Sequence, residues 1–357
     1  MNAENTQTVQ VKKVTKNRIR VDYEGKMSFW QRFKLKVTST YFLTQVLWYL
    51  FRLVLLIGIS YVILFPFFSK IAGSFMAFED FVDVTVRVIP KHFTLDTYKA
   101  IFVENNYLDA FLNTTLLSIS AALLQTFVCT LVGYGIAKFK FRGNGLIMIL
   151  VVLTMIVPHE TLRLSFTMHF RYFDFGGLAG ILREDGTRII PGILQIFGIG
   201  TQSLLNTFWP ILIISASGLA FKNGLYIFMM RQFFRGVPDE LEESAYVDGA
   251  NTMRTFFNII LPLSVPMMIT IFLFAFSWQW TDEFYTTLFF PTANKVTLMP
   301  DIVAIPPSLV VNEAGKSLYE TAIKNTAGIM IILPLVVVYL FCQKYLVQGI
   351  ERSGIVG

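Results

Sequence analysis

Six long apolar stretches limit this chain to one class of fold, a bundle of membrane-spanning helices. A helix needs about 20 apolar residues to cross the hydrocarbon core of a bilayer. Stretches of about that length lie at 46–68, 110–136, 146–166, 206–234, 259–288 and 326–346. Charged residues make up 15% of the chain, whereas soluble domains carry about 25%. We therefore predict an all-α, polytopic membrane protein with about six transmembrane helices.

The charges between these stretches predict the orientation of the chain. Lys and Arg concentrate in the cytoplasmic loops of membrane proteins. With the basic tail at 1–45 in the cytoplasm, the loops after the second and fourth stretches carry cations, and the first external loop carries acids. The cations are Lys138, Lys140, Arg142, Arg231, Arg235 and Arg254, and the acids are Glu79, Asp80, Asp83 and Asp96. Both termini are therefore expected to be cytoplasmic. The net charge of +6 is explained by the loops, and no nucleic-acid partner is expected.

A polar segment at 238–258 separates the fourth and fifth stretches and predicts two short helices joined by a turn. Pro238 favours a helix start, and the acids that follow it suit the positive end of a helix dipole. Gly249 can adopt the positive φ that ends a helix at little cost. Asn251 or Thr252 can cap the next helix. Taken alone, these features also fit an ordinary cytosolic turn.

The same segment resembles the EAA loop of permease subunits in ATP-binding-cassette (ABC) importers. The family pattern is Glu-Ala-Ala, three residues, Gly, nine residues, Ile, one residue and Leu-Pro. Glu243, Ala245, Gly249, Ile259, Leu261 and Pro262 stand at those spacings, Asp248 and Ala250 match the extended form, and Ser244 replaces the first Ala. Residues 95–98, 111–114 and 343–349 are similar to carbohydrate permeases of the maltose-transporter kind, over roughly 47–357. Val356 departs from that family, which often has Lys before the last Gly.

The resemblance implies a type I ABC importer permease in the bacterial plasma (inner) membrane. Its domains would be a cytosolic tail at 1–45, a permease domain at 46–350 that holds the coupling loop at about 238–258, and a tail at 351–357. The implied partners are a second homologous permease, two cytosolic ATPase subunits, an extracellular solute-binding protein and membrane lipid. The chain would be no enzyme and hold no cofactor, because ATP and Mg bind the ATPase subunits. It would import sugars, with oligosaccharides expected, by alternating access.

Two other classes of function remain open at this point. A permease for another small solute fits the same loop. An ion-coupled secondary transporter would show inverted repeats and several midplane charges, and the sequence shows neither clearly. A membrane enzyme is disfavoured, because the sequence shows no paired catalytic constellation. Gly315, Lys316 and Ser317 suggest a phosphate loop, but Val310 stands where that motif needs Gly.

Four residues are candidates for the translocation pathway. Lys222 and Asn223 lie within the fourth apolar stretch, where an ionisable residue usually faces a cavity or a partner. The alternative is a break between two shorter helices, with Lys222 reaching an internal acceptor. Trp278 and Asp282 suit sugar hydroxyls at an outer mouth, or an interfacial aromatic belt. If Lys222 faces the pathway, a saccharide that carries carboxylates becomes a candidate substrate. No metal site is expected.

Two regions carry no firm assignment. Residues 28–36 mix aromatic and basic side chains, which suits either a helix on the membrane surface or a solvated tail. Residues 170–202 are longer than usual for the family that the chain resembles, and would form an extracellular insertion that contacts the partner permease or the binding protein.

Overall fold

The computed structural model describes residue 30 and residues 40–173, 202–291 and 296–354, the last eight of these by their backbone alone. The predictions for 28–36, for most of 170–202 and for the final residues lie outside this part of the chain. Within it the secondary structure is helical, with two isolated β-bridges and no strand. The all-α prediction is therefore confirmed. The chain divides into two units, 1–68 and 69–357.

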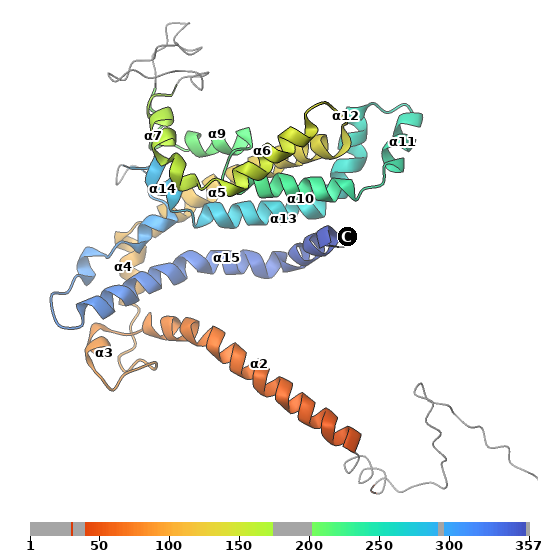
Figure 1. Cartoon of the computed structure of the whole chain (residues 1–357). Coiled ribbons are helices and arrows are strands. Elements are labelled where there is room, and N and C mark those ends of the chain that lie inside the picture. Colours follow the sequence, from red (N-terminus) through yellow and green to blue (C-terminus); the bar gives the residue numbers. More distant parts are fainter. Residues whose placement is uncertain (1–29, 31–39, 174–201, 292–295, 355–357) are drawn as a thin grey trace, which may run out of the picture. The chain divides into compact units, whose positions relative to one another are not determined.

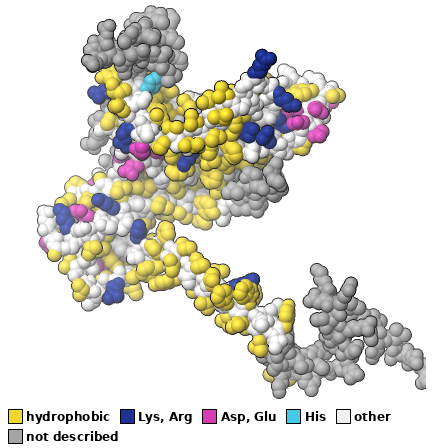
Figure 2. Space-filling model, in the orientation of Figure 1, with side chains coloured by type: hydrophobic (Ala, Val, Ile, Leu, Met, Phe, Trp, Pro, Cys, Tyr) yellow, Lys and Arg dark blue, Asp and Glu magenta, His cyan; other side chains and the backbone are white. Residues whose placement is uncertain are grey.

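The first unit contains one long described helix, α2 (Thr40–Gly73), whose last residues belong to the second unit. Apolar side chains are exposed along its whole length, as the face shown in Figure 2 illustrates. A helix that is apolar on all sides is typical of a membrane span.

Helix α5 (Tyr107–Lys138) is the centre of the second unit. It packs against α10 (Asn223–Arg235) and α13 (Leu261–Trp280), and α15 (Lys316–Gly354) packs on α13 (Figure 1). Gly133 makes the contact with α10 close, since a Cβ there would lie 2.6 Å from the Cβ of Met230. The core between these helices is lined by large side chains such as Tyr226 and Trp280.

Shorter elements connect and cover these helices. They are α3 (Phe78–Val82), α4 (Asp96–Glu104), α6 (Asn144–Ile156), η1 (His159–Leu162), α7 (Arg163–Arg171), α9 (Trp209–Ser217), α11 (Glu240–Val247), α12 (Thr252–Thr255), η3 (Phe256–Ile260), α14 (Phe284–Phe289), η4 (Met299–Val303) and η5 (Pro307–Leu309). Elements α11 and α12 lie at one end of the second unit, and α4 and α14 lie toward the other (Figure 1).

Two of the predicted spans are not continuous helices. In the described residues, four helices are long and apolar enough to span a membrane, or five if the bent pair 144–156 and 159–171 is counted as one. That pair bends by 92° at Pro158, because Pro removes a backbone donor and holds Val157 in an extended conformation. The fourth predicted span is broken between α9 and α10. Gly218 and Lys222, with φ of 78° and 72°, bound the break, so the expected alternative of two shorter helices is confirmed.

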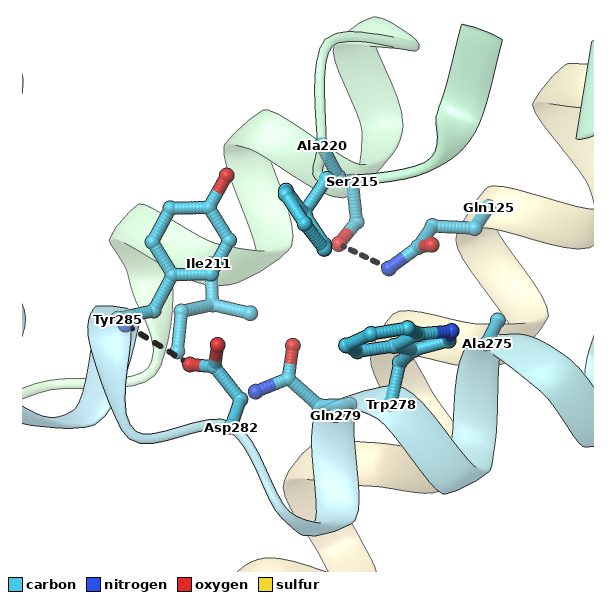
Figure 3. A pocket seen from close by; sticks show the side chains of 10 residues that line it. Gln125, Ile211, Ser215, Ala220, Ala275, Trp278, Gln279, Asp282 and Tyr285 are labelled. Carbon is cyan, nitrogen blue, oxygen red and sulfur yellow. Dashed lines mark hydrogen bonds between the residues drawn. The ribbon is translucent and has the colours of Figure 1, made fainter. Parts of the chain in front are cut away.

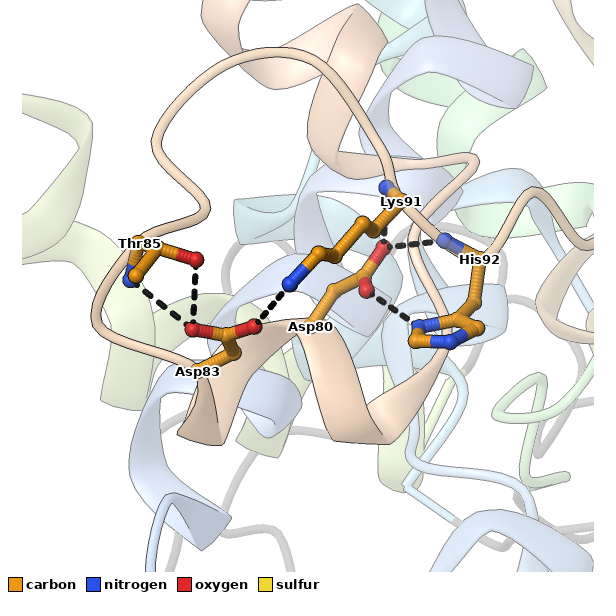
Figure 4. A network of polar contacts seen from close by, with 5 residues as sticks. All are labelled: Asp80, Asp83, Thr85, Lys91 and His92. Carbon is orange, nitrogen blue, oxygen red and sulfur yellow. Dashed lines mark hydrogen bonds and ion pairs between the residues drawn. The ribbon is translucent and has the colours of Figure 1, made fainter.

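Residues 74–96 form a segment held together by two carboxylates (Figure 4). Buried Asp80 accepts hydrogen bonds from the backbone N–H groups of Lys91 and His92 at 2.9 and 3.0 Å, and from the His92 ring at 2.7 Å. Asp83 accepts hydrogen bonds from Thr85 and from the Lys91 ammonium at 2.7 Å. Burial raises the pKa of Asp80, but the hydrogen bonds from His92 and Lys91 outweigh it and hold the pKa below its usual value.

The proline-rich segment after α14 contains the two 3₁₀ turns η4 and η5. Its 3₁₀ turns η4 and η5 are tied to α4 and α5 by side chains of those helices and of their junction. Asn105 donates to the carbonyls of Ile302 and Ala304 at 2.8 and 2.7 Å, and the hydroxyl of Thr114 accepts from the Met299 N–H at 2.8 Å.

Candidate functional site

Helix α11 ends in a turn that depends on Gly249. The N–H of Ala250 donates to the carbonyl of Ala245 at 2.9 Å, and the N–H of Gly249 donates to Tyr246 at 3.0 Å. This pair of bonds is the Schellman motif, which needs a left-handed residue after the helix. Gly249 supplies it with φ of 80°. The predicted positive φ at Gly249 is confirmed.

A buried lysine fixes α11 to the end of α5. The Lys138 ammonium donates to the carboxylate of Asp239 and, at 2.6 Å, to the carbonyl of Val237. It also lies 3.6 Å from the carboxylate of Glu242, which accepts a hydrogen bond from the hydroxyl of Tyr134 at 3.1 Å. The hydrogen bond from Lys138 holds the pKa of Asp239 below its usual value. These contacts join a membrane helix directly to the polar segment.

The other face of this segment is open. We define the α11–α12 segment as residues 239–258. Of its acids, Glu240, Glu243 and Asp248 are exposed, and the described chain gives none of them an ion-pair partner. On the face shown in Figure 2, acidic side chains gather at this end of the unit. Apolar side chains stand among them, with 86% of Val247 and 65% of Met253 exposed. A surface that mixes free carboxylates with exposed apolar side chains is suited to a protein partner.

The second half of the segment leads into α13 through a distorted turn. Asn251 caps α12 by accepting a hydrogen bond from the Arg254 N–H at 2.8 Å, so the predicted cap is confirmed. The π-helical turn η3 follows, and Pro262 stands at the start of α13. The missing N–H and the ring of Pro262 oppose regular α-helical hydrogen bonds in this turn. Ile259 and Leu261 pack against the core.

A second group of functional residues surrounds the break between α9 and α10. The Lys222 ammonium lies 4.5 Å from the ring centroid of Phe221 and 4.8 Å from that of Trp278. The ring of His159 packs edge-on against Phe221 at 4.8 Å. These side chains come from the bend after α6, from the break, and from α13. Three broken or ending helices thus meet at one place.

An open cavity of about 660 Å³ lies there. It is lined by Pro158, His159, Glu160, Arg163, Phe221, Trp278, Thr281, Asp282, Glu283, Phe284 and Thr287. A cavity of about 20 Å³ adjoins it and shares Phe221, Trp278 and Asp282 (Figure 3). Asp282 accepts a hydrogen bond from the Tyr285 N–H at 2.8 Å, and the amide of Gln125 donates to the Ser215 hydroxyl at 3.2 Å. The combination of flat aromatic faces with convergent polar groups is typical of a small-molecule site.

Comparison with known proteins identifies the family. The family model for "Binding-protein-dependent transport system inner membrane component" matches residues 129–352. The chain belongs to this family of transport permeases. The matched region contains the whole α11–α12 segment and every residue that lines the larger cavity.

Curated relatives of this permease include transport proteins of Bacillus subtilis. It is 27% identical to protein LplC of Bacillus subtilis over 309 residues, which cover 84% of this chain and 92% of the relative. It is 27% identical to the polygalacturonan/rhamnogalacturonan transport permease YtcP of the same species over 299 residues, which cover 82% of this chain and 92% of the relative. It is 25% identical to the galactooligosaccharides transport permease GanQ, also of that species, over 313 residues, which cover 86% of this chain and 95% of the relative. A solved bacterial ABC transporter involved in the import of alginate shares its fold. The TM-score is 0.61 at 19% identity, over 85% of this chain and 97% of that one.

The permease structure brings together most of the predicted pathway residues. Trp278 and Asp282 line both cavities, and the Lys222 ammonium lies against the Trp278 ring. Neither Lys222 nor Asn223 lines a cavity itself. Asn223 is fully buried at the start of α10, near Cys129. The Lys222 side chain contacts the rings of Phe221 and Trp278, and among the described residues it has no hydrogen-bond acceptor of the kind that the alternative expected. Across the described residues, no cluster of His, Cys, Asp and Glu could hold a metal ion.

Several residues of both sites were missed in the sequence. The charge pattern predicts Lys138 only as a loop cation, because its contacts with Val237 and Asp239 span about 100 positions in the sequence. His159 and Phe221 were also missed. The one available signal was Phe221, an aromatic residue directly before an intramembrane lysine.

Proposed function

We propose that this permease is a subunit of an ATP-driven importer of oligosaccharides and works by alternating access. In this proposal a pair of cytosolic ATPase subunits binds the α11–α12 segment, a second homologous permease completes the membrane pathway, and an external binding protein delivers the solute. ATP and Mg bind the ATPase subunits. Both termini then lie in the cytoplasm, with the tails and the permease domain divided at about 45 and 350.

The main support for this proposal is the structure of the α11–α12 segment. The α11–α12 segment has a free outer face and an inner face that is tied by Lys138 to α5, the helix at the centre of the second unit. Closure of an ATPase pair would push on the outer face, and the buried contacts would pass the displacement to α5. Such coupling requires that the segment bind the open and closed ATPase states with different free energies.

The oligosaccharide class is supported by the relatives. GanQ is named for galactooligosaccharides, and YtcP for polygalacturonan and rhamnogalacturonan. The aromatic and polar lining of the larger cavity suits a saccharide.

The test begins with the importer purified through a tag on this chain. ATPase and second-permease subunits should co-purify, and the complex in proteoliposomes should hydrolyse ATP faster when binding protein loaded with oligosaccharide is added. Uptake of the oligosaccharide should require ATP. Uptake by this chain that follows an ion gradient without ATP would contradict the proposal.

A further inference from the structure

We propose that the cavity beside the α9–α10 break is a subsite of this chain for a neutral sugar residue of the imported oligosaccharide. This inference rests on the function proposed above and adds two statements to it. The chain itself contacts the solute, and the contact selects against carboxylate-bearing sugars.

The size and the walls of the cavity fit a sugar ring. Its volume of about 660 Å³ lies within the range of small-molecule sites. The indole of Trp278 is half exposed, and the rings of Phe221 and Phe284 also line the space. Flat aromatic faces bind the C–H faces of a pyranose by dispersion and apolar burial, and they bury that surface with little loss of side-chain entropy.

Polar groups converge on the same space. Glu160 and Arg163 form an ion pair at 3.5 Å at the wall, and Thr281 and Thr287 add hydroxyl groups. The smaller cavity provides an independent indication of a polar occupant. Gln279 is 8% exposed, and its amide nitrogen lacks a hydrogen-bond partner among the described residues. Figure 3 shows this amide beside the carboxylate of Asp282. A buried donor without an acceptor is costly, so a sugar hydroxyl or a water molecule is expected there.

The charges favour a neutral sugar over a uronate. Glu160, Asp282 and Glu283 line the cavity, and the nearby cations are Arg163 and Lys222. Arg163 is paired with Glu160. A carboxylate on the solute would therefore enter a space that already holds an excess of carboxylates, and like charges at short range repel each other.

Lys222 has a different role in this arrangement. Its ammonium lies against the rings of Phe221 and Trp278 and makes cation–π contacts with both. Its backbone is held at φ of 72°, a conformation that is unfavourable for a lysine. We assign Lys222 as a positioning residue that orients the indole face of Trp278, and not as a receptor for a carboxylate.

The experiment uses the complete importer in proteoliposomes with four trisaccharide probes, of galactose, arabinose, glucose and galacturonate. Each is tested with the binding protein for stimulation of ATP hydrolysis. Thr281→Cys, in a Cys342→Ser background, then reports occupancy of the cavity through labelling by a small water-soluble thiol reagent. A neutral trisaccharide that stimulates hydrolysis should slow labelling at least about fivefold. Trp278→Ala should abolish this protection and raise the KM for uptake about tenfold, whereas Trp209→Ala, on an exposed tryptophan outside the cavity, should leave both unchanged.

Two further variants separate the roles of the charges. Asp282→Asn should reduce the preference for neutral over uronate probes, and Lys222→Met should raise the KM for the neutral probe with kcat unchanged. The subsite is overturned, with the importer function intact, if a neutral probe stimulates hydrolysis but never protects Thr281→Cys. It is also overturned if the galacturonate probe is the one that stimulates and protects, and Lys222→Met abolishes both. Stimulation by none of the four probes would contradict the oligosaccharide class itself, and the subsite with it.

Discussion

The 74–96 segment and the α11–α12 segment are both rich in acids, but they use their carboxylates differently. In the 74–96 segment, Asp80 and Asp83 accept hydrogen bonds from the same segment, so the acids fold it. In the α11–α12 segment, Asp239 and Glu242 face Lys138, while Glu243 and its exposed neighbours have no cation among the described residues. A paired carboxylate thus stabilises the fold of its own segment, whereas an unpaired one beside exposed apolar side chains is available to a partner.

The most severe change should be Lys138→Met. It removes the cation shared by Asp239 and Glu242 and leaves the Glu242 carboxylate buried without a positive partner. Breaking a buried ion pair by removing one partner costs about 3 kcal/mol or more. We expect a lower Tm of the purified importer and a loss of coupled uptake. Tyr134→Phe, which removes one hydrogen bond to Glu242, should cost only about 1 kcal/mol. If Lys138→Met and Tyr134→Phe lowered Tm and uptake equally, Lys138 would not be the main contact between α5 and α11.

Glu243→Lys should have the second largest effect. Glu243 is exposed and contributes little to folding, but a charge-assisted contact with a partner is worth about 1.5–3 kcal/mol. We expect uptake per ATP hydrolysed to fall about tenfold or more while Tm stays the same. Glu240→Lys is the matched control on the same helix, because its carboxylate is also exposed but stands outside the family pattern. If both variants behave alike, the role of Glu243 is not specific.

Asp80→Asn should act on the 74–96 segment alone. The loss of the charge-assisted hydrogen bonds should reduce amide-exchange protection of the segment by about 1–2 kcal/mol and leave ATPase attachment unchanged. Since the folded pKa of Asp80 is lowered, its stabilisation is fully present above the unfolded pKa of about 3.9 and is lost as pH falls through the folded value. Wild-type protein should therefore lose protection here only at strongly acidic pH. Detachment of the ATPase subunits in Asp80→Asn would contradict the statement that Asp80 acts only within the 74–96 segment.

Gly249→Ala should have the smallest effect. No atom lies within 4 Å of the added Cβ, so the change tests the positive φ alone, at a cost of about 1 kcal/mol. Coupling should weaken about fivefold, without loss of assembly. Gly145→Ala, where the space is equally open and φ is not positive, should be neutral. A Gly249→Ala importer with wild-type coupling would show that the Schellman turn tolerates the strain.

Local features of the fold could be predicted from the sequence, and long-range ones could not. The turn at Gly249 and the cap at Asn251 were predicted, since each depends on neighbouring residues. The sequence does not decide between one fourth span and two shorter helices. The reason is that residues 206–234 are apolar on average, which hides the break at Gly218 and Lys222. Pro158 did signal the bend at 146–166, yet its apolar neighbours favoured an unbroken span.

In the candidate sites, too, local motifs could be predicted from the sequence and long-range contacts could not. The family spacing placed Glu243 and Gly249 in one motif. The contact of Lys138 with Asp239, and the meeting of His159, Phe221 and Trp278, depend on how distant helices pack. No local spacing carries that information, so Lys222 and Trp278 are predicted as separate candidates and not as neighbours.

Cysteine cross-linking can show whether the α11–α12 segment is the surface that binds the ATPase. Val247 and Val84 are similarly exposed, at 86% and 91%, and belong to the two segments compared here. We predict that Val247→Cys, in a Cys342→Ser background, cross-links to the co-purified ATPase subunit with a short bifunctional thiol reagent. The yield should change when ATP binds, and Val84→Cys should give no such product. An ATPase cross-link from Val84→Cys, or none from Val247→Cys in any nucleotide state, would contradict the account.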